Sequence, residues 1–428
     1  MDKFLNSKNF FLKSSKHIPL GTQTFSKSIK VLPFGVSPLY SSKAKGSNIW
    51  DVDNNKYIDF CNALAAVIIG YADKEVDKAV IKQMKNGVTF SLSHTIETIV
   101  AKKIIDLVPS AQMVRFGKNG TDATSAAIRL ARAYTKKNKI LVCGYHGWQD
   151  WYIASTTRDL GVPNDVKKLT IKLEYNNFDD LVKKIENNKE DLAALIMEPM
   201  NSSYPKKGYL EKIRFLTEKY KIVLIFDETI TGFRFSLGGA QKLFNITPDL
   251  TTLGKGLANG YPLSVICGKK KIMELMEDIF FSGTFNGETL SLAAAEKTID
   301  IMKNKKVLTT IKKNGYHLER EVKKLISKYA LENVISITGH PTWTFLNFKD
   351  ISNISKIKIK SYLMQELFDN GIFLLGTHNL SLSNNHQNIQ KLLSEYDKIF
   401  FNIKKGIANN SFEKLFKGKE IEPIFKIR

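Results

Sequence analysis

Short apolar runs alternate with helical stretches through the middle of the chain, from about residue 75 to residue 300. The runs have the length of buried strands, and they cover residues 113–116, 140–143, 194–197, 222–226 and 263–267. Between them, apolar residues recur at helical spacing. Buried strands that alternate with helices are typical of an α/β sheet with mostly parallel strands. We predict that architecture for this part of the chain.

The clearest of these helices follows Gly120 and Thr121. Asp122 falls in its first turn, where a negative charge suits the helix dipole. Its apolar positions repeat at helical spacing, and they are Ala123, Ala127, Leu130, Ala131 and Tyr134. We predict a long helix that begins at about residue 120.

The two ends of the chain depart from this alternation. Residues 46–60 place apolar side chains around an Asp53-Asn54-Asn55 turn, which is typical of a hairpin. Beyond residue 305, the pattern predicts a long helix to Tyr329, a strand at 342–348, a helix at 358–368 and a last helix after His386. We predict an N-terminal arm and hairpin over 1–60, a large domain over 61–304 and a smaller α+β domain over 305–428.

Composition narrows the class of protein. The 64 Lys and Arg residues against 42 Asp and Glu residues give a net charge of +22, but the lysines are spread along the chain and no nucleic-acid motif accompanies them. The three cysteines (Cys61, Cys143 and Cys267) lack the spacing of a disulfide framework or a zinc site. No apolar stretch has the length of a membrane span or the form of a signal peptide. We expect a cytoplasmic protein with no metal, membrane or nucleic-acid partner.

Two residues carry the strongest chemical signal. Asp227 directly follows the apolar run at 222–226, at the strand end where open α/β sheets place ligand-binding groups. Lys255 lies between Gly254 and Gly256, which leave room beside its amine. A lysine that attacks a carbonyl and a buried aspartate that pairs with a protonated ring nitrogen are what pyridoxal phosphate (PLP) requires.

Two further segments suit the same cofactor. Asn119, Gly120 and Thr121 stand at the start of the predicted helix, where backbone N–H groups can bind a phosphate. Tyr145 and His146 follow the run at 140–143, where an aromatic side chain could cover the cofactor ring. Each segment alone is also typical of a turn, a helix cap or a packed loop. Their combination favours a PLP site.

With these motifs, the chain resembles the class III (ornithine-type) aminotransferases of fold type I, and among them most closely the glutamate-1-semialdehyde aminomutases. The matching segments run in the family's order between about residues 20 and 300, and they are 46–60, 68–71, 114–124, 145–147, 198–199, 227–234, 248–256 and 282–284. The resemblance implies an α/β fold with a large, mostly parallel sheet flanked by helices and a smaller α+β C-terminal domain.

The resemblance also implies roles for individual residues. Lys255 would form a Schiff base with PLP, and Asp227 would pair with the pyridine nitrogen. The phosphate would bind at Gly120 and Thr121 in the segment that begins at Asn119. Tyr145 would stack on the cofactor ring, with His146 beside it, and Glu198 would support the site. Thr284 would reach the phosphate of the neighbouring subunit in a homodimer.

Departures from the aminomutase pattern concern the substrate. Lys27 stands where the aminomutases have a carboxylate-binding arginine, Leu64 where they have a tryptophan, and His378 or Asn379 where they have a glutamate. Glu288 lies in Gly-Glu-Thr, where the family usually has Gly-Asn-Pro. We predict a transaminase that takes an amino group from a small-molecule donor to a small carbonyl, or sugar-like, acceptor. The main alternative is the intramolecular aminomutase, and a basic scaffold or nucleic-acid-binding protein is a remote one.

Overall fold

The computed structural model describes residues 2–423, which fall into two compact units. Unit 1 combines the chain up to Asp73 with the chain from Val307 onward, and unit 2 is the continuous segment Lys74–Lys306. Within residues 2–423, no helix combines the length and the apolar character needed to cross a bilayer.

Unit 2 is built on a seven-stranded sheet with the spatial order β4-β10-β9-β8-β7-β5-β6. The strands are β4 (Met113–Gly117), β5 (Lys139–Cys143), β6 (Thr170–Lys172), β7 (Leu192–Met197), β8 (Val223–Glu228), β9 (Leu250–Leu253) and β10 (Ser264–Gly268). Strands β9, β8, β7, β5 and β6 pair in parallel. Strand β10 runs antiparallel to both of its neighbours. The prediction of a large, mostly parallel sheet is confirmed.

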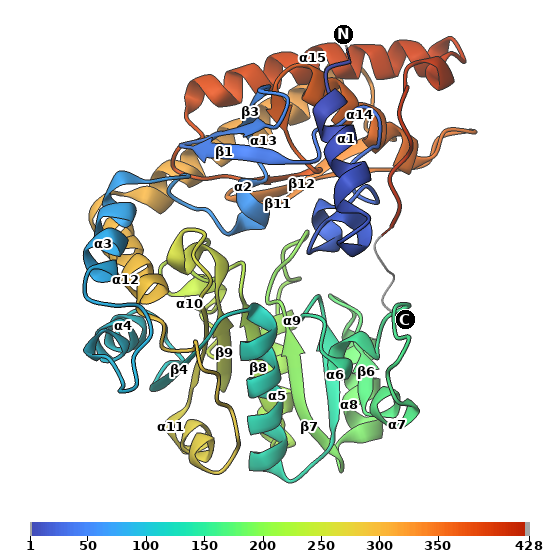
Figure 1. Cartoon of the computed structure of the whole chain (residues 1–428). Helices are drawn as coiled ribbons and strands as arrows, with labels where there is room; N and C mark the ends of the chain where they lie inside the picture. Colours follow the sequence, from blue (N-terminus) through green and yellow to red (C-terminus); the bar gives the residue numbers. More distant parts are fainter. Residues whose placement is uncertain (1, 424–428) are drawn as a thin grey trace. The chain divides into compact units, whose positions relative to one another are not determined.

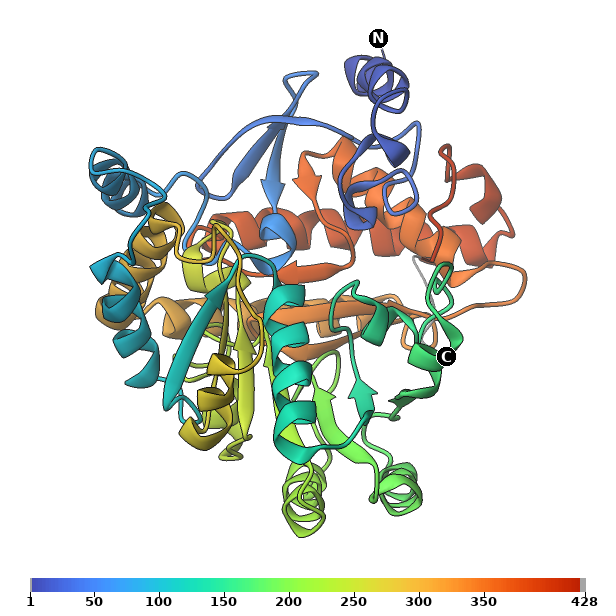
Figure 2. The same cartoon turned by 60° about the horizontal axis from the view of Figure 1, so that its bottom comes forward.

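Helices cover both faces of this sheet (Figure 1, Figure 2). Successive side chains of a strand point to opposite faces. Val223 and Ile225 of β8 therefore join the core beneath α5 (Gly120–Thr135), whereas Leu224 and Phe226 join the core beneath α8 (Phe178–Asn188) and α9 (Tyr209–Lys219). Strands buried on both faces need apolar residues at every position. This is why the sequence shows continuous apolar runs.

The other helices of unit 2 are shorter or lie beside the sheet's edge. They are α3 (Lys74–Met84), α4 (Thr95–Ile105), α6 (Asp150–Ile153), α7 (Asn164–Lys168), α10 (Gly239–Phe244), α11 (Lys270–Met273) and α12 (Thr289–Asn304), with 3-10 turns at Lys255–Ala258 and Glu274–Glu277. Helix α5 begins at Gly120, at the predicted position, because Asp122 accepts hydrogen bonds from the backbone N–H groups of Lys118 and Asn119. This capping interaction fixes the turn that enters the helix.

Unit 1 contains two small sheets, β1-β2-β3-β13 and β11-β12-β14. The strands are β1 (Ser41–Lys45), β2 (Asn48–Asp51), β3 (Lys56–Asp59), β11 (Ile335–His340), β12 (Trp343–Phe348), β13 (Ile372–Phe373) and β14 (Thr377–Asn379). The helices are α1 (Leu5–Ser14), α2 (Asn62–Ala65), α13 (Val307–Lys328), α14 (Lys356–Asp369) and α15 (His386–Ala408), with 3-10 turns at Pro19–Gly21, Phe25–Lys27 and Phe412–Lys414.

Unit 1 joins segments that the sequence pattern treats separately. The predicted arm over 1–60 and the predicted domain over 305–428 share one sheet, because β3 pairs in parallel with β13 and brings Ile58 opposite Ile372. The predicted hairpin corresponds to β2 and β3, and Asp51 closes its turn by accepting hydrogen bonds from the N–H groups of Asp53 and Asn55. Residues 61–73 also belong to this unit rather than to the large one.

Candidate active site

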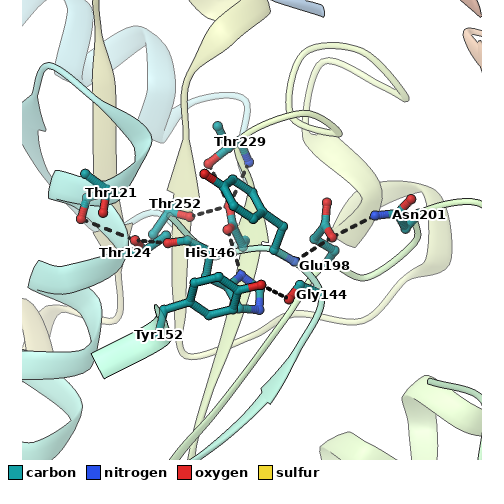
Figure 3. A network of polar contacts seen from close by, with 11 residues as sticks. Thr121, Thr124, Gly144, His146, Tyr152, Glu198, Asn201, Thr229 and Thr252 are labelled. Carbon is teal, nitrogen blue, oxygen red and sulfur yellow. Dashed lines mark hydrogen bonds and ion pairs between the residues drawn. The ribbon is translucent and has the colours of Figure 1, made fainter. Parts of the chain in front are cut away.

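Asp227 occupies the carboxyl end of β8, the strand in the middle of the large sheet. Its side chain is buried, and its carboxylate lies 2.8 Å from His146 Nδ1. Thr229 and Thr252 donate hydrogen bonds to the same carboxylate through their hydroxyl groups (Figure 3). Asp227 is thus a buried carboxylate whose position is fixed by polar neighbours.

These neighbours keep Asp227 ionised. Burial raises the pKa of the Asp227 carboxyl, but the interaction with His146 and the hydrogen bonds from Thr229 outweigh burial, so the pKa lies below its ordinary value. A buried, ionised carboxylate needs a cationic or N–H partner. A protonated ring nitrogen is such a partner.

Lys255 lies at the carboxyl end of the neighbouring strand, β9, where it begins a 3-10 turn. Its backbone adopts the left-handed region, with φ at +44°. Strained conformations of this kind are concentrated at functional sites. Lys255 and Asp227 line one cavity of about 220 Å³ with Asn119, Gly120, Thr121, Tyr145, His146 and Glu198. All eight residues for which a cofactor contact was predicted within one subunit are therefore together in unit 2.

The loop after β5 supplies Tyr145 and His146. Glu198 supports this loop by accepting hydrogen bonds from the N–H of Tyr145 (3.1 Å) and from Asn201 Nδ2 (2.8 Å) (Figure 3). Burial and the nearby charge of Asp227 raise the pKa of Glu198. Gly144 allows the loop to run close to the Glu198 side chain, because a Cβ at this position would lie 2.5 Å from Glu198 Oε2.

The start of α5 forms the wall of the cavity where a phosphate would bind. Thr121 Oγ1 is buried and has no hydrogen-bond partner within residues 2–423. Gly147 passes so close that a Cβ at this residue would lie 2.4 Å from Thr121 Oγ1. An unpaired hydroxyl at a helix N-terminus, with a carboxylate and a lysine in the same cavity, fits PLP by its donor set.

Thr284 and Glu288 belong to another part of unit 2. Thr284 lines a second cavity, of about 540 Å³, with Phe90, Leu92 and its chain neighbours Ser282, Gly283, Asn286 and Gly287. Glu288 caps α12 by accepting hydrogen bonds from the N–H groups of Leu290 and Ser291. It also forms an ion pair with Lys118 Nζ at 2.9 Å. Glu288 therefore has two structural roles that the sequence prediction of a substrate contact did not include.

The other predicted substrate residues lie in unit 1. Lys27 and Leu64 line one cavity of about 260 Å³. His378 lies elsewhere in this unit and is fully buried, with Nδ1 2.8 Å from Thr344 Oγ1 and Nε2 2.7 Å from Tyr396 Oη. Because both ring nitrogens of His378 are engaged within the core, we do not carry the predicted substrate contact of His378 into the proposal below.

Sequence reasoning missed Thr229 and Thr252. Thr229 lies two residues after Asp227, a spacing at which a hydroxyl can reach a carboxylate, so the sequence held a signal for it. Thr252 had no such signal, because it reaches Asp227 only through the pairing of β8 with β9, which sets the two residues side by side.

The fold and this site define a PLP-dependent enzyme of fold type I. The family model for class III aminotransferases matches residues 34–389. The chain is 37% identical over 385 residues to 3-aminobutyryl-CoA aminotransferase from Cloacimonas acidaminovorans, covering 88% of this chain and 91% of that one. It is 34% identical over 419 residues to glutamate-1-semialdehyde 2,1-aminomutase from Methanococcoides burtonii, covering 91% and 97%. The chain belongs to the class III aminotransferase family.

Solved structures agree with this assignment. The FumI protein of Sphingopyxis sp. MTA144, with PLP, superposes with a TM-score of 0.87 at 25% identity and covers 96% of this chain and 99% of its own. An omega-transaminase from Sphaerobacter thermophilus superposes with a TM-score of 0.84 at 25% identity, covering 94% and 98%. The cofactor of this chain is PLP, and the chain is a transaminase or an aminomutase of the same family.

Proposed function

We propose that this protein is an intermolecular transaminase, which moves an amino group from a small-molecule donor to a carbonyl acceptor. The observation that carries the proposal is the cavity that Lys27 and Leu64 share. The aminomutases that the sequence resembles have an arginine and a tryptophan at these positions. A lysine makes a point-charge contact instead of a bidentate one, and leucine removes the aromatic wall.

The cavity that Lys27 and Leu64 line also supports a proposal for the chemical class of the acceptor substrate. Its walls are mostly apolar, with contributions from Leu32, Leu39, Ile49, Phe373 and Leu375. Such walls suit a hydrocarbon arm better than the polyol of a sugar. We propose an acceptor with an apolar arm and an anionic group that Lys27 binds. The relative named 3-aminobutyryl-CoA aminotransferase supports intermolecular transfer.

PLP, when bound, supplies an electron sink for negative charge that develops beside the substrate's amino-bearing carbon. In the proposed reaction, Lys255 Nζ holds the cofactor covalently and, once released, moves the proton that leaves this carbon. Asp227, ionised, holds a proton on the ring nitrogen. Gly120 and Thr121 bind the phosphate, while Tyr145 covers the ring, beside His146, and Glu198 holds the loop that carries them.

The alternative is the intramolecular aminomutase, which the relatives of that name favour. Purified protein incubated with glutamate-1-semialdehyde alone separates the two reactions, because no external donor or acceptor is present. We expect slow formation of 5-aminolevulinate and faster amino transfer when a donor amine and a separate acceptor are supplied. Rapid 5-aminolevulinate formation from glutamate-1-semialdehyde alone would contradict the transaminase proposal.

Lys255→Ala is the matched control for both reactions. It should lose amino transfer and the covalent attachment of cofactor after borohydride reduction. In the unsubstituted protein, peptide mapping after reduction should find the pyridoxyl group on Lys255. A pyridoxyl group on another lysine would overturn the assignment of the site.

We further propose a homodimer in which Thr284 reaches the phosphate bound by the partner subunit. Exposed apolar side chains beside the second cavity support a partner surface in unit 2. Leu92 is 84% exposed and Phe285 is 61% exposed. Aromatic side chains such as that of Phe285 are enriched at the buried centres of interfaces.

A further inference from the structure

The two oxygens of the Asp227 carboxylate differ in the number of donors that they receive. Oδ1 accepts from Thr229 Oγ1 at 2.6 Å, from Thr252 Oγ1 at 2.9 Å and from the Thr229 N–H at 3.1 Å. Oδ2 forms a hydrogen bond of 2.8 Å with His146 Nδ1. The two oxygens therefore have different capacities for a further donor.

A carboxylate oxygen has about two lone-pair sites. Three donors fill Oδ1, whereas Oδ2 keeps a site beside the one that His146 uses. Rotation of the carboxylate would break the bonds to both threonines at once. We propose that Thr229 and Thr252 are positioning residues that lock Asp227 through Oδ1 and present Oδ2 to the ring nitrogen of PLP. This inference rests on the role that we propose for Asp227.

The backbone explains how two threonines from different strands meet at one oxygen. Asp227 of β8 and Thr252 of β9 are paired in the parallel register of the sheet. Thr229 follows Asp227 directly beyond the strand end, and its methyl group faces Gly120, where an added Cβ would lie 3.2 Å from it. Thr229 thus directs its hydroxyl to Asp227 and its methyl to the start of α5.

The hydroxyl groups also act on the charge of Asp227. Burial raises the pKa of this carboxyl, and the hydrogen bonds from Thr229 are among the interactions that lower it. Removal of donors that favour the charged form raises a carboxyl pKa. The other titratable groups around Asp227 are His146, Tyr145, Glu198, Tyr152 and Lys255, and threonine-to-valine changes leave all of them in place.

PLP binding to the full-length apo protein, titrated from pH 3 to pH 8, tests the inference. Thr229→Val and Thr252→Val keep the shape of each side chain and remove one donor. We expect the acid midpoint of binding to rise by about one pH unit, which weakens binding by up to about tenfold at pH values below the midpoint of the unsubstituted protein and little at pH 8. Thr229→Ser, which keeps the hydroxyl, should behave as the unsubstituted protein does.

Thr231→Val is a matched control from the same loop. The Thr231 hydroxyl is also buried, but it donates to Glu228 Oε2 at 2.8 Å instead of to Asp227. This variant should leave the acid midpoint unchanged. Equal midpoints in Thr229→Val, Thr252→Val and the unsubstituted protein would overturn the inference, and so would an equal rise in Thr231→Val. If one valine variant does not fold, the other gives the same test.

Asp227→Asn separates this inference from the role of Asp227 itself. An amide does not ionise, so we expect this variant to bind PLP weakly and without the acid midpoint of the unsubstituted protein. An unchanged titration in Asp227→Asn would remove the ring-nitrogen role and the inference with it. A changed titration in Asp227→Asn with unchanged valine variants would overturn only the role of the threonines.

Discussion

A buried histidine in unit 1 shows how its surroundings decide what a titratable residue can do. His378 is fully enclosed, and among residues 2–423 no acidic group pairs with its ring. Burial lowers its pKa from 6.5 to about 3. The neutral ring therefore exchanges hydrogen bonds with Thr344 and Tyr396, and protonation would place an unpaired charge in the core.

His378 should make the stability of the protein sensitive to acid. Its folded pKa lies below its unfolded value, so its contribution is complete above pH 6.5 and is lost as the pH falls toward 3. A difference of this size corresponds to about 4–5 kcal/mol in the free energy of unfolding. In urea unfolding at several pH values, His378→Gln should show a weaker loss of stability between pH 6.5 and pH 4 than the unsubstituted protein.

The exposed His17 provides the control for this measurement. His17→Gln should reproduce the pH dependence of the unsubstituted protein, since its ring is open to solvent. If His378→Gln and His17→Gln gave the same curve, the acid sensitivity would arise from other groups.

Residues whose places in the fold depend on near neighbours in the sequence were the ones that could be predicted. Lys255 between two glycines and Asp227 after an apolar strand were predicted to belong to one site, and both line the same cavity. Thr252 could not be found in this way, because its contact with Asp227 depends on strand pairing. The place of His378 in the core could not be found either, since Tyr396 and Thr344 are distant in the sequence.

Among the elements, the shortest has the least usual backbone. Helix α2 (Asn62–Ala65) is a single left-handed turn, with φ values of +45°, +51°, +58° and +70° along its length. Each non-glycine residue in this conformation costs about 1–2 kcal/mol. Buried amides oppose that cost, since Asn62 Nδ2 donates to the Asn379 carbonyl at 2.7 Å and to Asn384 Oδ1 at 2.8 Å.

A substitution to glycine usually lowers the free energy of unfolding of a helical segment, and in this turn we expect the opposite effect. Ala63→Gly relieves a positive φ, so we expect the free energy of unfolding to stay constant or rise by up to about 1 kcal/mol. Ala79→Gly, at a partly buried position in the right-handed helix α3, should lower it by about 1 kcal/mol. Chemical unfolding of the two variants makes the comparison, and a loss of the same size in Ala63→Gly would argue against strain in the turn.

The sequence predicted the regular elements better than this one. Strand β8 and helix α5 follow from apolar runs, helical spacing and a capping aspartate, all of which are local. In the sequence of the left-handed turn, only Asn62 indicates this conformation, because alanine and leucine usually avoid positive φ. Contacts with Asn379 and Asn384, more than 300 residues away, impose the turn.

At the scale of the whole molecule, the homodimer can be tested through one side chain. Leu92→Asp places a charge on the surface that we propose to be buried in the dimer, where an unpaired carboxylate is costly. We expect light scattering to show a shift from dimer toward monomer, together with loss of PLP. Phe215→Asp, at another exposed apolar position of unit 2, should leave the mass unchanged. An unchanged mass in Leu92→Asp would contradict a dimer through this surface.

The division of unit 1 between both ends of the chain has a consequence during synthesis. The hydrogen bond from Asn62 to Asn379 cannot form until Asn379 has been synthesised, 317 residues later. At about 5–20 residues per second, that interval lasts roughly 15–60 s. Unit 2, which is continuous, can fold within this time, while the nascent strand β3 has no β13 to cover its edge. A ribosome that stalls between residues 307 and 372 therefore leaves a chain with a complete cofactor-binding sheet and an open strand edge, which favours aggregation.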